Sequence, residues 1–211
     1  TWHDVPTTLN NSSFGYCKSA TRIIWPESPA VIGRACFDSC TALTEPTEVP
    51  DYITSIPYEA FRHCTSLPSF TLHAGVLTVR PNAFRSCTGL TEFTFEGNVP
   101  VVEEYVFGEC TGLHTVNFSY PVTAIKASSF ISDSSLRNLN MPAQGDVTLS
   151  IIGESAFQGC SSIEVFPDII DGNTLVENSA FLGASSLRHI ILPSGGLVES
   201  EAGRNRHIQD A

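Results

Sequence analysis

The 211-residue sequence has little positive charge, no long apolar run and none of the short motifs that mark common enzymes. Its 11 Lys and Arg residues face 22 Asp and Glu residues, which gives a formal net charge of −11 at pH 7. Nucleic acids and anionic membranes are bound through clustered Lys and Arg, so the composition argues against both as main partners. Apolar runs such as 99–102 are far shorter than the roughly 20 residues of a spanning helix, so no membrane-spanning segment is expected.

Catalytic and metal-binding signatures are missing as well. The sequence contains no G-x-S-x-G, no phosphate-binding G-x-x-x-x-G-K-[ST] loop, no H-E-x-x-H and no Cys-x-x-Cys pair. Its acidic residues are scattered rather than paired. We therefore expect a protein that is not an enzyme and that uses no cofactor and no metal.

What the sequence does contain is a series of phenylalanines at nearly constant spacing. Consecutive members of the series are 23, 24, 23, 23, 23, 27 and 24 residues apart, by subtraction of their positions. The series consists of Phe14, Phe37, Phe61, Phe84, Phe107, Phe130, Phe157 and Phe181. A fixed period of this length is typical of a solenoid, in which each repeat is one coil stacked on its neighbours.

Each repeat has two halves with different periods. Apolar residues at i, i+1, i+4 and i+7, as in Ala60, Phe61, Cys64 and Leu67, are typical of one face of a short helix. After Leu67 and its equivalents the pattern alternates, as in Phe93 and Phe95, which is typical of a strand with one buried face. We predict an α/β solenoid of about eight coils of 23–27 residues, with a concave parallel sheet and short convex helices.

We call the eight phenylalanines of this series the ladder Phe residues. Six of the seven cysteines each lie three residues after a ladder Phe, so they share one position of the coil. A residue that recurs once per coil belongs to an interior stack, where a free Cys packs as a small apolar side chain. We predict reduced, buried thiols, with disulfides or metal ligation as the alternatives. The predicted core ladder includes Phe37, Phe61, Phe84, Phe107, Cys40, Cys64, Cys87 and Cys110.

The repeat resembles the BspA-like leucine-rich repeat family. Residues 152–163, which read I-G-E-S-A-F-Q-G-C-S-S-I, match that family's I-G-x-x-A-F-x-x-C-x-x-L unit almost position for position. Residues 32–43 match it with Cys36 in the Ala position. The resemblance covers nearly the whole chain. It implies a curved solenoid used for adhesion or protein binding, often on a cell surface, without catalytic residues in the repeat.

Three irregularities interrupt the period. The interval of 27 residues before Phe157 fits a turn-rich insertion at 143–146, and Asp133 replaces Cys in the same coil. A carboxylate there must either turn to solvent or hydrogen-bond to the backbone. Trp2 precedes Phe14 by the twelve residues that separate Trp25 from Phe37, so we expect the solenoid, residues 1–193, to start partway through a coil. We expect residues 194–211 to form a degenerate cap or a tail.

The outward positions of the predicted strands provide the candidate binding surface. Ten residues after each Phe lies a column of uncharged hydrogen-bonding side chains that an extended peptide or a glycan could contact. The alternative is that Thr and Asn are there only because they suit strands. The candidate binding residues are Thr47, Thr71, Thr94, Asn117, Asn140, Glu92 and His73.

Two functions remain open from the sequence. The first is a recognition or adhesion module that binds another protein through the concave face, with a glycan as the alternative partner. The second is an accessory or scaffold subunit of a larger intracellular or organellar assembly, which free thiols would suit. The family resemblance favours the first function and a cell-surface or secreted location.

Overall fold

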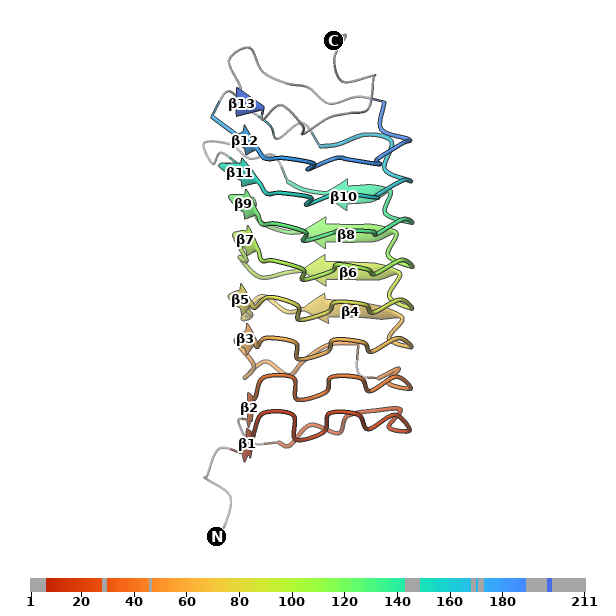
Figure 1. Cartoon of the computed structure of the whole chain (residues 1–211). Coiled ribbons are helices and arrows are strands. Elements are labelled where there is room, and N and C mark those ends of the chain that lie inside the picture. The colour runs from red at the N-terminus through yellow and green to blue at the C-terminus, as the bar shows by residue number, and fades with distance from the viewer. Residues whose placement is uncertain are drawn as a thin grey trace.

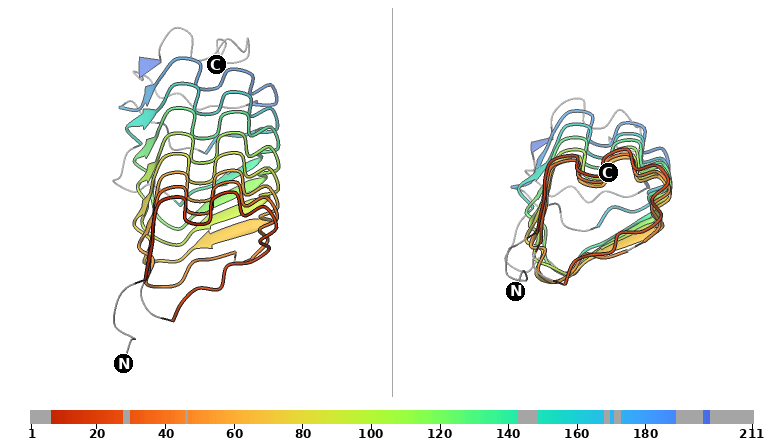
Figure 2. Two further views of the ribbon diagram at one scale, coloured as in Figure 1. Left: turned by 60° about the horizontal axis from the view of Figure 1, so that its bottom comes forward. Right: turned by 90° about the horizontal axis from the view of Figure 1, so that it is seen from below.

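A computed structural model gives the fold of the chain as a parallel β-solenoid of about seven turns, close to the eight coils expected from the eight phenylalanines (Figure 1). The structure describes residues 7–27, 30–45, 47–142, 149–167, 170, 173–188 and 197–198. Seen end-on, the long strands, the short strands and the turns lie on three different sides of each coil (Figure 2). No helix capable of crossing a membrane occurs in these described ranges.

The strands form two rows. One row is a four-stranded parallel sheet in the order β4-β6-β8-β10, and the other contains the short strands, with β7-β9-β11-β12-β13 as its longest sheet. The bounds are β1 Thr7–Leu9, β2 Ala30–Ile32, β3 Ser55–Ile56, β4 Ser69–Leu72, β5 Thr78–Val79, β6 Glu92–Phe95, β7 Val101–Val102, β8 Thr115–Phe118, β9 Ala124–Ile125, β10 Asn138–Asn140, β11 Ile151–Ile152, β12 Leu175–Val176 and β13 Leu197–Val198.

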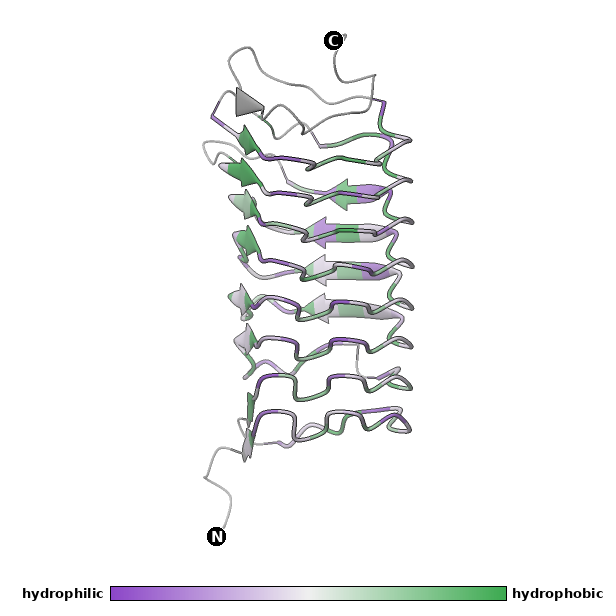
Figure 3. Ribbon diagram, in the orientation of Figure 1, coloured by the Kyte–Doolittle hydropathy of each residue, from purple (hydrophilic) through white to green (hydrophobic). Residues whose placement is uncertain are grey.

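The long strands lie where the alternating pattern predicts them. In β6, Phe93 and Phe95 are buried while Glu92 faces solvent and Thr94 is half-buried. Hydropathy alternates in the same way along β8 and β10 (Figure 3). The short strands were not predicted, because most of them contribute a single buried residue, such as Ile56 or Val79, and two or three residues are too few to show a period.

The predicted convex helices are wrong, because the part of the chain that the structure describes contains no helix. The segments around each ladder Phe are instead chains of turns. The residues two before and two after each Phe have positive φ, as at Asn82 (61°) and Ser86 (59°) around Phe84. L-residues in the left-handed region cannot continue a right-handed helix, so two of them within five residues prevent one.

The turn segments are joined between coils by a ladder of their own. Every second backbone N–H donates to a carbonyl of the next coil, as from Phe37 to Ala60 (2.9 Å) and from Ser39 to Arg62 (2.7 Å). The intervening N–H groups close turns within the coil, as from Cys40 to Phe37 (3.2 Å). This arrangement satisfies the backbone without a helix and retains the apolar spacing that a helix would show.

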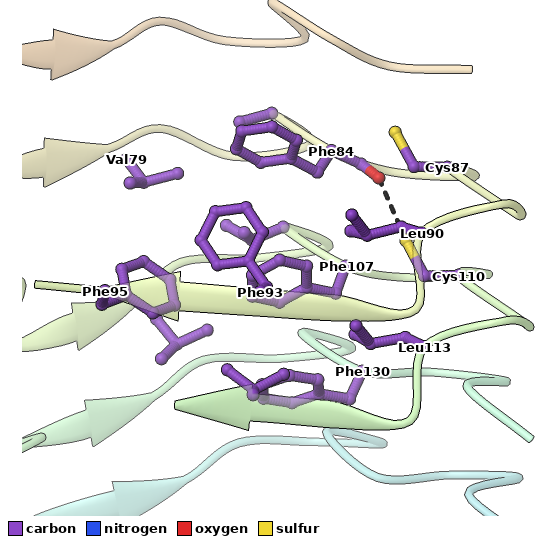
Figure 4. Close-up of a cluster of buried hydrophobic side chains, with 14 of the residues drawn as sticks. Val79, Phe84, Cys87, Leu90, Phe93, Phe95, Phe107, Cys110, Leu113 and Phe130 are labelled. Atoms are coloured by element: carbon purple, nitrogen blue, oxygen red, sulfur yellow. Dashed lines mark hydrogen bonds between the residues drawn. The ribbon is translucent and has the colours of Figure 1, made fainter. Parts of the chain in front are cut away.

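The core is built from the same ladder in every coil. Rings of consecutive ladder phenylalanines stack almost parallel, for example Phe61 on Phe84 at 5.3 Å and Phe107 on Phe130 at 5.3 Å between centroids. Phe93 from the long strand packs edge-on against Phe84 and Phe107 (Figure 4). Among the predicted ladder residues, Phe37, Phe61, Phe84, Phe107, Cys40, Cys64, Cys87 and Cys110 are all buried.

Several expectations fall on residues outside the described ranges. They concern Trp2, the insertion at 143–146 and most of the predicted cap at 194–211. Within that last stretch β13 is described, and it pairs with β12 in the register Val176↔Val198.

Candidate functional site

The strand face is the solvent side of the sheet formed by β4, β6, β8 and β10. In a parallel sheet, residues in register point to the same side, so each outward position forms a straight column across the coils. The inner column consists of Thr71, Thr94, Asn117 and Asn140. The outer column consists of Ser69, Glu92, Thr115 and Asn138.

Side chains of the inner column bond to one another along the column. The Asn140 side-chain amide donates to Asn117 Oδ1 at 2.8 Å, and the Asn117 amide donates to Thr94 Oγ1 at 3.2 Å. Asn117 also donates to the carboxylate of Glu92 at 2.8 Å. These bonds hold the amides in fixed orientations and leave further lone pairs and N–H groups for a ligand.

The structure moves one predicted residue out of the inner column. The partner of Thr71 on the preceding coil is Glu48, not Thr47, and the backbone carbonyl of Thr47 accepts the N–H of Thr71 at 2.7 Å. The preceding bridge joins Arg22 to Glu45, so the extra residue of this 24-residue interval lies between Glu45 and Glu48. The inner column therefore continues to Glu48, and alignment on Phe alone could not locate the extra residue.

His73 lies just beyond the strand face and is engaged within its own coil and the preceding one. Its Nδ1 accepts the backbone N–H of Gly75 at 3.0 Å, and its Nε2 donates to the carbonyl of Pro50 at 3.1 Å. With both ring nitrogens occupied, the imidazole fixes a turn after β4. The other predicted residues, Thr71, Thr94, Asn117, Asn140 and Glu92, are brought together on one surface.

The turn face, formed by the outward side chains of the turn segments, is charged and internally paired. Arg62 donates two hydrogen bonds to Asp38, at 3.0 and 2.9 Å, and His63 lies 3.3 Å from the same carboxylate. Burial opposes ionisation of Asp38, but the hydrogen bonds and charge of Arg62, together with His63, outweigh it and lower the pKa of Asp38. Arg85 and Glu109 pair at 2.6 Å two coils further on.

The buried thiols are hydrogen-bond donors. In five coils the Cys Sγ donates to the carbonyl of the ladder Phe of the preceding coil, at 3.0–3.3 Å; the pair Cys110–Phe84 is drawn in Figure 4. Burial raises the pKa of Cys40 to about 11 and that of Cys87 to about 12, which keeps both thiols protonated. Buried thiols of raised pKa are poor nucleophiles, so they serve structure.

Asp133 occupies the thiol position in the coil of Phe130 and is completely buried. Its Oδ1 accepts the N–H of Cys110 at 2.8 Å, whereas Oδ2 has no partner. Of the two outcomes expected for this carboxyl, the structure shows the hydrogen-bonded one. Burial raises the pKa of Asp133 well above its usual range, and the nearby charge of Glu109 adds to the effect.

Nothing in the described residues points to catalysis. No group of three or more His, Cys, Asp or Glu side chains in these ranges is arranged to hold a metal ion. The strand face offers donors and acceptors in fixed columns, uncharged except for Glu48 and Glu92, a surface that can recognise a ligand by hydrogen bonding and shape.

Comparison with known proteins agrees with this architecture. A family model described as BspA type leucine-rich repeat region, in six copies, matches residues 31–164 and 122–202. The fold is similar to that of a leucine-rich repeat protein of T. pallidum, with 24% identity, a TM-score of 0.64 and coverage of 77% of this chain and 72% of that one. A leucine-rich repeat protein from Eubacterium ventriosum gives 19% identity, a TM-score of 0.53 and coverage of 74% and 46%. No curated protein matches the chain.

Proposed function

Because the chain belongs to the BspA-type leucine-rich repeat family, we propose that it is a non-catalytic protein-binding module whose partner docks on the strand face. The family consists generally of protein-binding modules, and its repeat carries no catalytic group. The observation that carries the proposal is the inner column, in which Thr94, Asn117 and Asn140 are linked at 2.8–3.2 Å and held in one orientation. A fixed row of donors and acceptors binds a partner with little ordering cost.

The partner is a protein that presents polar, mostly uncharged groups to this row, and the role is recognition or adhesion. A glycan offers similar hydrogen-bonding groups and is the alternative ligand. The turn face is a weaker candidate because its charges, such as Asp38 and Arg62, already satisfy one another. No contact among the described residues favours a scaffold role.

Photo-crosslinking tests the proposal and identifies the partner in one step. A benzophenone side chain replaces Thr94 on the strand face or, as the matched control, Thr88, which is exposed beyond the turn segment of the same coil. We expect a discrete protein adduct from position 94 and none from position 88. Adducts only from position 88, or from neither, would contradict docking on the strand face.

A further inference from the structure

The row of long strands ends at β10, and the backbone ladder on this side of the solenoid is interrupted between β10 and the next coil. At the preceding step the N–H groups of Arg137 and Asn138 both donate to the carbonyl of His114, at 3.0 Å. At the following step Arg188 N–H donates to the carbonyl of Glu164 at 2.9 Å. Among the described residues, no backbone hydrogen bond joins 137–141 to 162–167, and β10 is the last strand of its sheet (Figure 1).

Pro167 accounts for part of this break. It lies ten residues after Phe157, as Asn140 lies ten after Phe130, so it takes the next place in the inner column. Elsewhere an inner-column residue donates its N–H to the residue before its partner, as Thr71 does to Thr47 at 2.7 Å. Pro167 has no N–H to give to Leu139, so that rung cannot form.

The break leaves an open strand edge. The ladder register directs the N–H and C=O of Leu139 and the N–H of Met141 away from β8, toward the missing rung. The side chains keep their pattern across the break, since Phe166 is buried like Leu139. The chain therefore stays packed against the core there, while no described residue pairs with the outer backbone edge of β10.

A groove of about 550 Å³ lies over this edge. One wall comes from β10 and includes the exposed Asn138 and Asn140. The other is mixed: Ser162 and Glu164 are polar, and Val165, whose surface is 60% exposed, and Pro167 form its apolar part. A backbone edge beneath a two-sided groove is the complement of an extended peptide, which supplies backbone hydrogen bonds and alternating side chains.

We propose that this groove binds an extended peptide segment of the partner by strand addition to β10. The peptide donates to and accepts from Leu139 and Met141, and places an apolar side chain against Val165 and Pro167. This inference rests on the proposed protein-binding function. It adds the place where the partner's backbone binds, which is the β10 edge of the strand face.

The test uses two synthetic probes and fluorescence anisotropy. The first is a fluorescein-labelled Thr-Val-Thr-Val-Thr-Val peptide with blocked ends, and the second is the same peptide N-methylated at alternate residues to remove the amides of one edge. We expect the first to bind the wild-type protein and the second to bind at least about tenfold more weakly, since two or three hydrogen bonds are lost. Equal binding of both probes, or no binding of the first up to millimolar concentration, would overturn strand addition.

Two variants test whether the probe binds in this groove. Pro167→Val supplies the missing N–H, lets the coil pair with Leu139 and should reduce binding of the first probe by about tenfold. Pro68→Val, which makes the same change in an exposed proline before β4, should leave it unchanged. Unchanged binding to Pro167→Val would exclude this groove. Crosslinking through position 94 does not depend on the probe, so failure here is distinguishable from failure of the proposed function.

Discussion

The turn face and the strand face are built from the same repeat, but they differ in how far their residues recur from coil to coil. On the turn side every coil repeats the same devices: a stacked Phe, left-handed residues two positions either side of it and, in most coils, a thiol bonded to the preceding coil. On the strand side the outward residues change from coil to coil, from Ser69 through Glu92 to Asn138. Positions that repeat carry stability, and positions that vary are free to carry recognition.

The greatest loss of stability is expected from a substitution in the middle of the Phe stack. Phe84→Ala removes a ring that stacks on Phe61 and Phe107 and meets Phe93, and it should lower the free energy of unfolding by about 3–5 kcal/mol. Urea denaturation followed by circular dichroism measures this change. Phe14→Ala is the control, because that ring is 45% exposed at the end of the ladder and should cost much less. Equal losses would mean that burial in the stack is not what stabilises the coil.

A smaller effect comes from the one carboxyl in the thiol ladder. Asp133→Asn keeps the acceptor for Cys110 N–H and replaces an acid that is costly to ionise, so it should raise the free energy of unfolding at pH 7 by roughly 1–3 kcal/mol. The thiols of Cys110 and Cys160 flank the site and stay protonated.

The pH dependence follows from the raised pKa of Asp133. Its stabilising contribution is fully present below the unfolded value of about 4 and is lost as the pH rises through the folded value. The difference in unfolding free energy between Asp133→Asn and wild type should therefore grow with rising pH. A difference that is constant from pH 4 to 8 would show that Asp133 does not titrate in this way.

The smallest effect on stability is expected on the strand face. Thr94→Ala removes a hydroxyl that bonds only to a surface amide, so the free energy of unfolding should change by no more than about 0.5 kcal/mol. Thermal denaturation followed by calorimetry checks this. A loss of several kcal/mol would place the inner column among the residues that hold the fold.

Much of the stacking could be predicted from the sequence, because the Phe, Cys and Leu positions recur at fixed spacing. The error over helices has a physical cause: spacing of i, i+1, i+4 and i+7 is shared by a helix and by this chain of turns. Ser, Asn or Gly two positions either side of many ladder phenylalanines, as at Asn82 and Ser86, was the available signal for left-handed residues.

The candidate site was predicted less completely. Strand alternation alone predicts Thr71, Thr94, Asn117 and Asn140. That Glu48 rather than Thr47 continues the inner column depends on where the extra residue of that coil lies. The engagement of His73 by Gly75 and Pro50 depends on contacts between coils, which alignment of repeats does not show. The open edge at β10 needs both the Pro167 position and the packing of Phe166 to be known.

One binding titration distinguishes whether recognition and stability lie on separate faces of the solenoid. The dissociation constant of the crosslinked partner is measured for wild type, Thr94→Arg and Thr88→Arg, which add the same charge to two exposed or half-buried positions of one coil. We predict at least tenfold weaker binding for Thr94→Arg, about 1.4 kcal/mol, and wild-type binding for Thr88→Arg. Wild-type binding by Thr94→Arg together with weakened binding by Thr88→Arg would contradict it.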